Sequence, residues 1–142
     1  MAIASIKDST MMYFSCDVGK FLDSKTGVLS LRNYDYASLF QTDFPMTKAE
    51  RIATFTSASS HAMTLMAVDL TAEGKPTKWM VENSWGSSHG HHGHLIMTDE
   101  WFDEYMFRLV VERDYIPEDL RGYLELKPVM LPAWDPMFLP EE

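Results

Sequence analysis

The stretch from residue 61 to residue 85 constrains the fold more than any other part of the chain. Two apolar runs, His61–Leu70 and 78–86, flank residues 73–76, whose sequence Glu-Gly-Lys-Pro is typical of a turn. This pattern predicts two antiparallel strands joined by a short loop. Because the start of one strand of a hairpin lies beside the end of the next, we expect His61 and Asn83 to be neighbours in space.

An amide next to an imidazole has a specific chemical use. The amide oxygen of Asn83 can accept an N–H bond from His61, which fixes the tautomer and aims the other ring nitrogen at a nucleophile. This is the His–Asn part of a Cys-His-Asn peptidase site. An isolated histidine is more often a satisfied surface or core residue, so the interpretation depends on the residues around it.

Composition limits the class of protein. The chain has 142 residues, 46% of them hydrophobic, and a net charge of −9, so we expect a single globular domain over residues 1–142 and no binding to nucleic acid. No apolar run reaches the ~20 residues of a membrane helix, and the first residues do not resemble a signal peptide. One cysteine cannot form an internal disulfide, so we expect a cytoplasmic protein.

The remaining pattern favours an α+β fold. A short helix is expected near residues 2–9, strands at 11–16 and 95–97, and helical turns that begin after Thr47 and Thr98. Thr47 and Glu50 have the spacing of a capping box. Residues 127–142 contain four prolines and should form an extended arm. Strands dominate, which predicts an antiparallel sheet or half-barrel with short peripheral helices.

Several segments together resemble the C-terminal half of the bleomycin hydrolase / aminopeptidase C family, which are papain-like cysteine aminopeptidases. Asn-Ser-Trp-Gly at 83–86 is a general papain-type signature. Met-Thr-Asp-Glu-Trp-Phe at 97–102 and Pro-Ala-Trp-Asp-Pro-Met at 132–137 are specific to this branch. The similarity keeps the family's order over nearly the whole chain, in segments 14–20, 46–51, 61–63, 78–86, 97–102 and 131–137.

The resemblance implies a fold and three site residues. The fold is the papain-like β-rich (right-hand) domain, without the helical domain that carries the catalytic cysteine. His61 matches the catalytic general base, Asn83 the residue that orients it, and Trp85 the indole that covers their hydrogen bond.

The resemblance also implies a role for the C-terminal arm, in which Trp134 and Asp135 match the family pattern. In the family the terminal carboxylate, here that of Glu142, enters the cleft and pairs with the amino group of the substrate. The ending 138–142 departs from the small residues typical of the family, and a disordered tail is the alternative.

The nucleophile is missing from this pattern. Cys16 is the only cysteine, and it lies 45 residues before His61 and not next to Trp or Tyr. The neighbouring Asp17 would raise the pKa of the thiol, so we interpret Cys16 as a structural, buried residue. The oxyanion glutamine of the family has no counterpart either. We therefore expect the chain to be inactive alone, as a truncated half of an enzyme.

This interpretation implies a partner. The face that meets the helical half in the family would be left open, so we expect a homo-oligomer or a complex with a complementary chain. A peptide would be a substrate only once that half is present. The alternative is a non-enzymatic remnant that serves as an oligomerisation or binding module. We expect no cofactor and no membrane association.

Two further clusters invite a functional interpretation. The four histidines of segment 89–94 resemble a metal tract, but they lack a spaced cysteine or acidic ligand, so we expect an incidental turn and no metal site. The four acids of segment 99–104 suggest acid–base chemistry or a calcium site. More often such a run is the solvated face of a helix with acids near its N-terminus.

Overall fold

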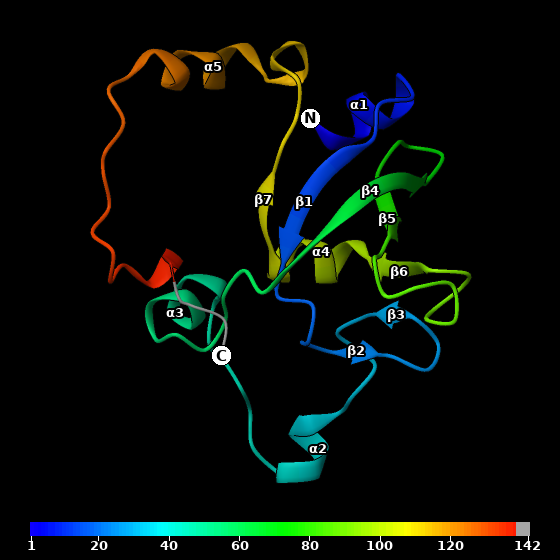
Figure 1. The fold of residues 1–142 in the computed structure, drawn as a ribbon. Helices are drawn as coiled ribbons and strands as arrows, with labels where there is room; N and C mark the ends of the chain where they lie inside the picture. The colour runs from blue at the N-terminus through cyan, green and yellow to red at the C-terminus, as the bar shows by residue number, and fades with distance from the viewer. Residues whose placement is uncertain (139–142) are drawn as a thin grey trace.

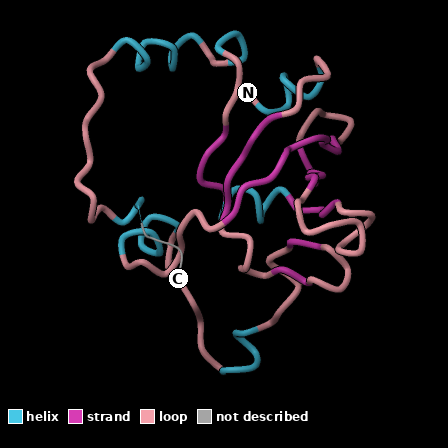
Figure 2. The backbone as a smooth tube through the Cα atoms, in the orientation of Figure 1, coloured by secondary structure: helices cyan, strands magenta, loops and turns pink. Residues whose placement is uncertain are grey.

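A computed structural model describes residues 1–138 (Figure 1). Short helices surround one sheet, and loops make up much of the chain (Figure 2). The elements are α1 (Ala2–Lys7), β1 (Met12–Cys16), β2 (Leu22–Asp23), β3 (Val28–Leu29), α2 (Tyr36–Phe40), α3 (Lys48–Ala53), β4 (His61–Leu70), β5 (Pro76–Glu82), β6 (His94–Thr98), α4 (Asp99–Tyr105), β7 (Met106–Leu109), η1 (Arg113–Tyr115), α5 (Glu118–Arg121), η2 (Gly122–Glu125) and η3 (Pro136–Phe138).

The strands of the described residues form one curled sheet in the order β2-β3-β6-β5-β4-β1-β7. The predicted hairpin is its centre: β4 pairs antiparallel with β5, and Thr64 lies opposite Glu82. The expectation of an antiparallel sheet needs one correction, because β3 pairs with β6 in parallel. This pair joins segments 68 residues apart, as in Val28 opposite Ile96, and two-residue strands leave too short a pattern to predict it.

Alternate residues of the central strands build the core. Phe14 of β1 lies opposite Met63 of β4, and Leu65 of β4 lies opposite Val81 of β5; all four side chains are buried. Helix α4 covers this face with residues that include the buried Trp101 and Phe102. The Phe102 ring stacks on Trp79 of β5 at a centroid distance of 4.8 Å. The core therefore lies between the sheet and α4.

The predicted helix starts are confirmed. The hydroxyl of Thr47 accepts a hydrogen bond from the Glu50 N–H, and the Glu50 carboxylate accepts one from the Thr47 N–H, which completes the capping box of α3. At α4 the Thr98 hydroxyl accepts from the Trp101 N–H. These bonds satisfy backbone donors that the first turn of a helix leaves free.

Helix α3 is attached to the end of α4 by cations. Lys48 donates from Nζ to the carbonyl oxygens of Asp103 and Met106, and Arg51 binds the carbonyl and the carboxylate of Glu104. The carbonyls at the end of a helix carry partial negative charge, so basic side chains stabilise that end. Partial burial lowers the pKa of Lys48. This attachment fixes α3 just before the loop that leads into β4.

Two segments leave the sheet. Residues 34–46, which include α2, extend away from it below β2, and the chain after β7 makes a wide excursion through α5 before it returns toward α3 (Figure 1). The expected extended arm is irregular up to the short helix η3, and its last residues, 139–142, lie outside the described part. No helix within residues 1–138 is long and apolar enough to cross a membrane.

Candidate active site

The hairpin brings His61 and Asn83 together as expected. His61 is the first residue of β4, and Asn83 directly follows the last residue of β5. The ring Nε2 of His61 lies 2.8 Å from Oδ1 of Asn83. Both side chains are half-buried, so they remain accessible to a substrate.

The hydrogen-bond network assigns the tautomer of the imidazole. The Ser84 N–H donates to the same Oδ1 at 2.8 Å, which requires the oxygen, and not the NH₂ group, of Asn83 to point this way. Nε2 of His61 must then carry the proton that it donates. In the neutral ring Nδ1 is left with its lone pair free, so it is the nitrogen that can accept a proton.

The loop after β5 holds Asn83 in place. The Asn83 N–H donates to the carbonyl of Gly93 at 3.0 Å, so the backbone of the histidine-containing loop positions this residue. Gly90 has a φ of +59°, and a Cβ there would lie 2.3 Å from the His94 carbonyl oxygen. A Cβ at Gly27, whose φ is +72°, would lie 2.5 Å from the Gly90 Cα. The glycines are therefore required for the close packing of this loop.

Trp85 lies against the histidine. Its ring centroid is 5.1 Å from that of His61, with an interplanar angle of 32°. An indole face at this distance stabilises a cationic imidazolium and shields one side of the ring from water. The side chain is still 37% exposed.

Asn83 Nδ2 is buried and has no hydrogen-bond partner within residues 1–138. An unsatisfied buried donor costs about 1–3 kcal/mol, so this amide is held in an unfavourable state. The Asn83 oxygen is hydrogen-bonded to the imidazole, whereas the NH₂ group of the same side chain is left without an acceptor among the described residues.

Cys16 lies close to His61 in the fold, although the two are 45 residues apart in the sequence. In the pairing of β1 with β4 it is directly opposite His61. Its side chain is fully buried, and burial, aided by the charge of Asp17, raises the pKa of the thiol to about 12. No hydrogen bond connects Cys16 to the imidazole among the described residues. The prediction of a buried cysteine is confirmed, and a thiol with this pKa supplies almost no thiolate near neutrality.

A buried carboxylate anchors the loop that enters β4. Asp17 accepts hydrogen bonds from the hydroxyls of Ser57, at 2.8 Å, and Ser60, at 3.5 Å. The Ser60 N–H also donates to the carbonyl of Cys16. These contacts fix the backbone one residue before His61. The sequence analysis missed this role of Asp17; the run of small hydroxylated residues before His61 was the available signal.

Two shallow hollows flank the site on the side of the sheet opposite α4. One, of about 360 Å³, is lined by residues that include Tyr13, Glu82 and Asn83. The other, of about 380 Å³, is lined by residues that include Ser15, His61 and Arg108. Ala62 and Tyr13 line both, so the hollows adjoin and form one uneven surface next to the imidazole.

The structure does not bring the C-terminal arm to the imidazole in its described part. Trp134 is 81% exposed, and the Asp135 carboxylate accepts from the Met137 N–H in its own turn. No hydrogen bond links either residue to His61 among residues 1–138. Glu142 lies outside the described residues.

The histidines of segment 89–94 and the acids of α4 were the other two candidate clusters. Among the described residues no three His, Cys, Asp or Glu side chains are grouped so that they could hold a metal ion. Of the acids of α4, Glu100 and Asp103 are exposed, as expected of a solvated face. Asp99 instead accepts from the indole N–H of Trp79 at 2.8 Å, and Glu104 binds Arg51.

Comparisons with known proteins agree with this architecture. Bleomycin hydrolase of Homo sapiens is 49% identical over 140 residues, and aminopeptidase C of Lactococcus lactis subsp. cremoris is 41% identical over 137 residues. The crystal structure of PepW from Lactobacillus rhamnosis HN001 superimposes with a TM-score of 0.88 at 41% identity. Each match covers 96% of this chain but 31% of the relative.

These relatives confirm the resemblance to the C-terminal half of the bleomycin hydrolase and aminopeptidase C proteins, and with it the papain-like β-rich fold. The chain spans about a third of the length of the relatives that it matches. The model of the peptidase C1-like family matches residues 1–138. The chain therefore belongs to the peptidase C1-like family.

Proposed function

We propose that this chain supplies the general base of a cysteine aminopeptidase, with His61 as the base and Asn83 as the residue that orients it. The observation that carries the proposal is the 2.8 Å contact between His61 Nε2 and Asn83 Oδ1, with the amide fixed by the Ser84 N–H. The names of the relatives, bleomycin hydrolase and aminopeptidase C, support the reaction class.

The free nitrogen defines the mechanism. A cysteine thiol beside Nδ1 would transfer its proton to His61 and attack the peptide carbonyl as a thiolate. The imidazolium then donates that proton to the leaving amine, which releases the C-terminal product and leaves an acyl-enzyme for hydrolysis. Asn83 keeps the ring in position through both transfers, and Trp85 stabilises the cationic intermediate state of the ring.

The nucleophile in this proposal comes from residues outside these 142. Cys16 is unsuited, because its thiol is fully buried and has a pKa of about 12. The 142 residues alone are therefore inactive. The remaining parts belong either to a longer polypeptide or to a separate chain.

The open side of the sheet is the proposed contact surface for that partner. One of its two hollows is lined by His61 and the other by Asn83, and Tyr13, which lines both, is 48% exposed. Docking of a cysteine-bearing half there would place a thiol near Nδ1 and exclude water from the His61–Asn83 bond. A homo-oligomer that covers the same face is the second possible arrangement, and it would serve a non-enzymatic role.

Reconstitution tests the proposal. The 142-residue chain is co-expressed with the cysteine-bearing remainder of a relative such as aminopeptidase C, and hydrolysis of an aminoacyl-coumarin is measured. We expect no turnover by either part alone and clear turnover by the complex. Replacement of His61 by Ala should lower kcat by about 10²–10⁴-fold, since general acid–base catalysis contributes that much.

A matched control is the exposed His91, whose replacement by Ala should leave kcat unchanged. A stable complex that remains inactive, or one whose activity survives His61→Ala, would refute the proposed role. Activity of the isolated chain that disappears in Cys16→Ser would show instead that Cys16 is the nucleophile.

A further inference from the structure

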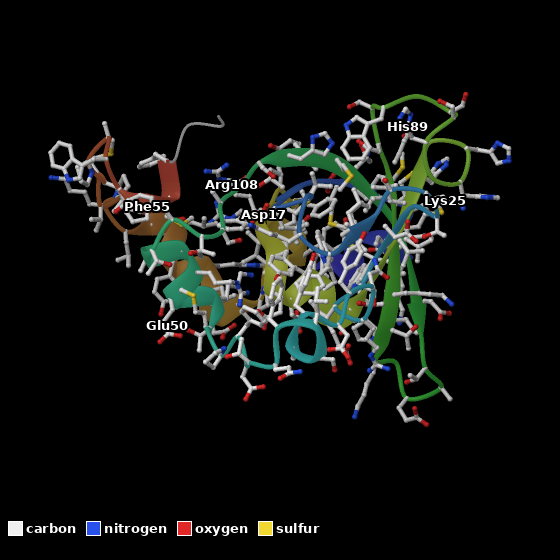
Figure 3. All side chains as sticks on the ribbon, turned by 90° about the horizontal axis from the view of Figure 1, so that it is seen from below. Asp17, Lys25, Glu50, Phe55, His89 and Arg108 are labelled. Atoms are coloured by element: carbon white, nitrogen blue, oxygen red, sulfur yellow. The ribbon has the colours of Figure 1, made fainter. Side chains whose placement is uncertain are left out.

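The hollow beside His61 carries a positive charge that the proposed chemistry does not use. Arg108 lines it from β7, and among residues 1–138 Arg108 takes part in no ion pair. Figure 3 shows Arg108 on the same side of the molecule as Asp17.

The sheet register places Arg108 in a row that ends at the residue next to His61. Arg108 of β7 lies opposite Ser15 of β1, and Ser15 lies opposite Ala62 of β4. Residues directly opposite each other in antiparallel strands project from the same face. The guanidinium, the Ser15 hydroxyl and the residue after His61 therefore share one side of the sheet.

A directed chain of hydrogen bonds runs along this row. Arg108 Nη1 donates to the Ser59 hydroxyl at 3.4 Å, and that hydroxyl donates to Ser15 Oγ at 2.9 Å. The Ser15 side chain is 2% exposed, and its own O–H has no acceptor among the described residues. A buried hydroxyl normally donates as well as accepts, so the end of this chain lacks an acceptor.

We propose that this hollow, defined by Ser15, Ser59 and Arg108, binds a carboxylate next to His61. A carboxylate accepts hydrogen bonds only, and it pairs with a guanidinium through two parallel bonds. The nearest carboxylate along the chain, Asp17, is buried beneath the serine loop, and both its oxygens face hydroxyls of that loop. It therefore does not occupy the hollow. The inference rests on the proposed function, because it assigns the hollow to the same cleft.

The carboxylate that fits this hollow is an acidic side chain of a bound peptide. Two probes separate carboxylate recognition from general peptide binding. N-acetyl-glutamyl-alanine amide and its glutaminyl isostere have the same size and differ in one charge. Titration of each into the isotopically labelled chain, followed by amide NMR signals, gives the two Kd values.

We expect the acidic peptide to bind with a Kd about tenfold lower than its isostere. Arg108→Gln should remove that preference, whereas Arg32→Gln, at an exposed arginine paired with Glu100, should preserve it. Equal Kd values for the two peptides would overturn the proposal.

This result is independent of catalysis. The peptide preference is measured without turnover, and it should persist in His61→Ala. Loss of activity on reconstitution without loss of the preference would reject the proposed function alone. If the reconstituted complex is active but the acidic peptide and its isostere bind with equal Kd values, the inference alone is rejected.

Discussion

On strands β1, β4 and β5 one face of the sheet is closed and the other is open, although both are built from alternate residues of the same strands. The closed face carries Phe14 and Met63, which are buried under α4. The open face carries Tyr13 and Thr64, directly opposite each other beside a hollow. The difference shows that the chain completes its own core while it leaves the surface next to His61 unfilled.

Two neighbouring residues of β1 give the sharpest test of this difference. Phe14 is fully buried and Tyr13 is 48% exposed. We expect Phe14→Ala to lower the free energy of unfolding by about 3–5 kcal/mol, because it removes buried area and leaves a cavity. Tyr13→Ala should lower it by less than about 1 kcal/mol.

Urea denaturation followed by tryptophan fluorescence measures both values. Similar losses for the two variants would mean that Tyr13 is covered in solution. In that case a second copy of the chain occupies the open face, and the loss from Tyr13→Ala should depend on protein concentration.

Cys16, which lies opposite His61, gives a second test of the difference between the two faces. Its side chain is fully buried on the closed face. The thiol pKa is raised from 9.0 to about 12 in the folded state by burial and by Asp17. Below pH 9 the thiol is neutral in both states, so its full stabilising contribution is present. Above pH 9 the unfolded chain ionises first, and stability is lost as the pH rises toward the folded-state pKa.

We expect a loss of about 2 kcal/mol by pH 10.5, relative to pH 8, from this group. The same measurement on Cys16→Ala should lack that loss while it retains contributions from other groups, including Tyr105, whose pKa is also raised by burial. Identical pH profiles for the two proteins, or fast reaction of Cys16 with a thiol reagent at pH 8, would show that the thiol is not sealed.

Asp17 connects the two faces, since it is buried and yet holds the loop that presents His61. Asp17→Asn keeps the size of the side chain but replaces one oxygen by a donor, which opposes the serine hydroxyls. We expect a loss of about 1–3 kcal/mol in the free energy of unfolding and a shift of the His61 ring signals in NMR spectra.

Asp103→Asn is the matched control, because Asp103 is exposed and uses only its backbone carbonyl. It should change neither quantity. If Asp17→Asn destabilises the protein but leaves the His61 signals in place, Asp17 is a structural residue and does not position the imidazole.

The sequence predicted those parts of the structure that are local. The hairpin, the capping box at Thr47 and the start of α4 at Thr98 each depend on residues within one or two turns or strands, and all three are confirmed. The contact between His61 and Asn83 followed from the hairpin. Local patterns were sufficient because a hairpin brings the start of β4 beside the end of β5, even though two irregularities shift the register between them.

The features that the sequence did not predict depend on pairing over long distances. The parallel pair of β3 and β6 needs the chain to return after 68 residues. The row from Arg108 to Ser15 depends on β7 pairing with β1, and the short helix α2 is not among the elements expected from the sequence. The charged and hydroxyl side chains that meet across long-range strand pairs have no regular spacing in the sequence, so the sequence does not show that they are neighbours.

The smallest expected effect concerns α3, which precedes the loop to His61. Thr47→Ala removes the hydroxyl that accepts from the Glu50 N–H but keeps the backbone N–H that donates to the Glu50 carboxylate, and it should lower the free energy of unfolding by about 1 kcal/mol. Thr77→Ala is a suitable control, since that hydroxyl is exposed and bonds Asp69 in the hairpin. Because α3 is attached to α4 through Lys48 and Arg51, fraying of its first turn should not reach the loop. Unchanged His61 signals in Thr47→Ala would support that separation, whereas a shift as large as that of Asp17→Asn would mean that the position of the imidazole depends on α3 as a whole.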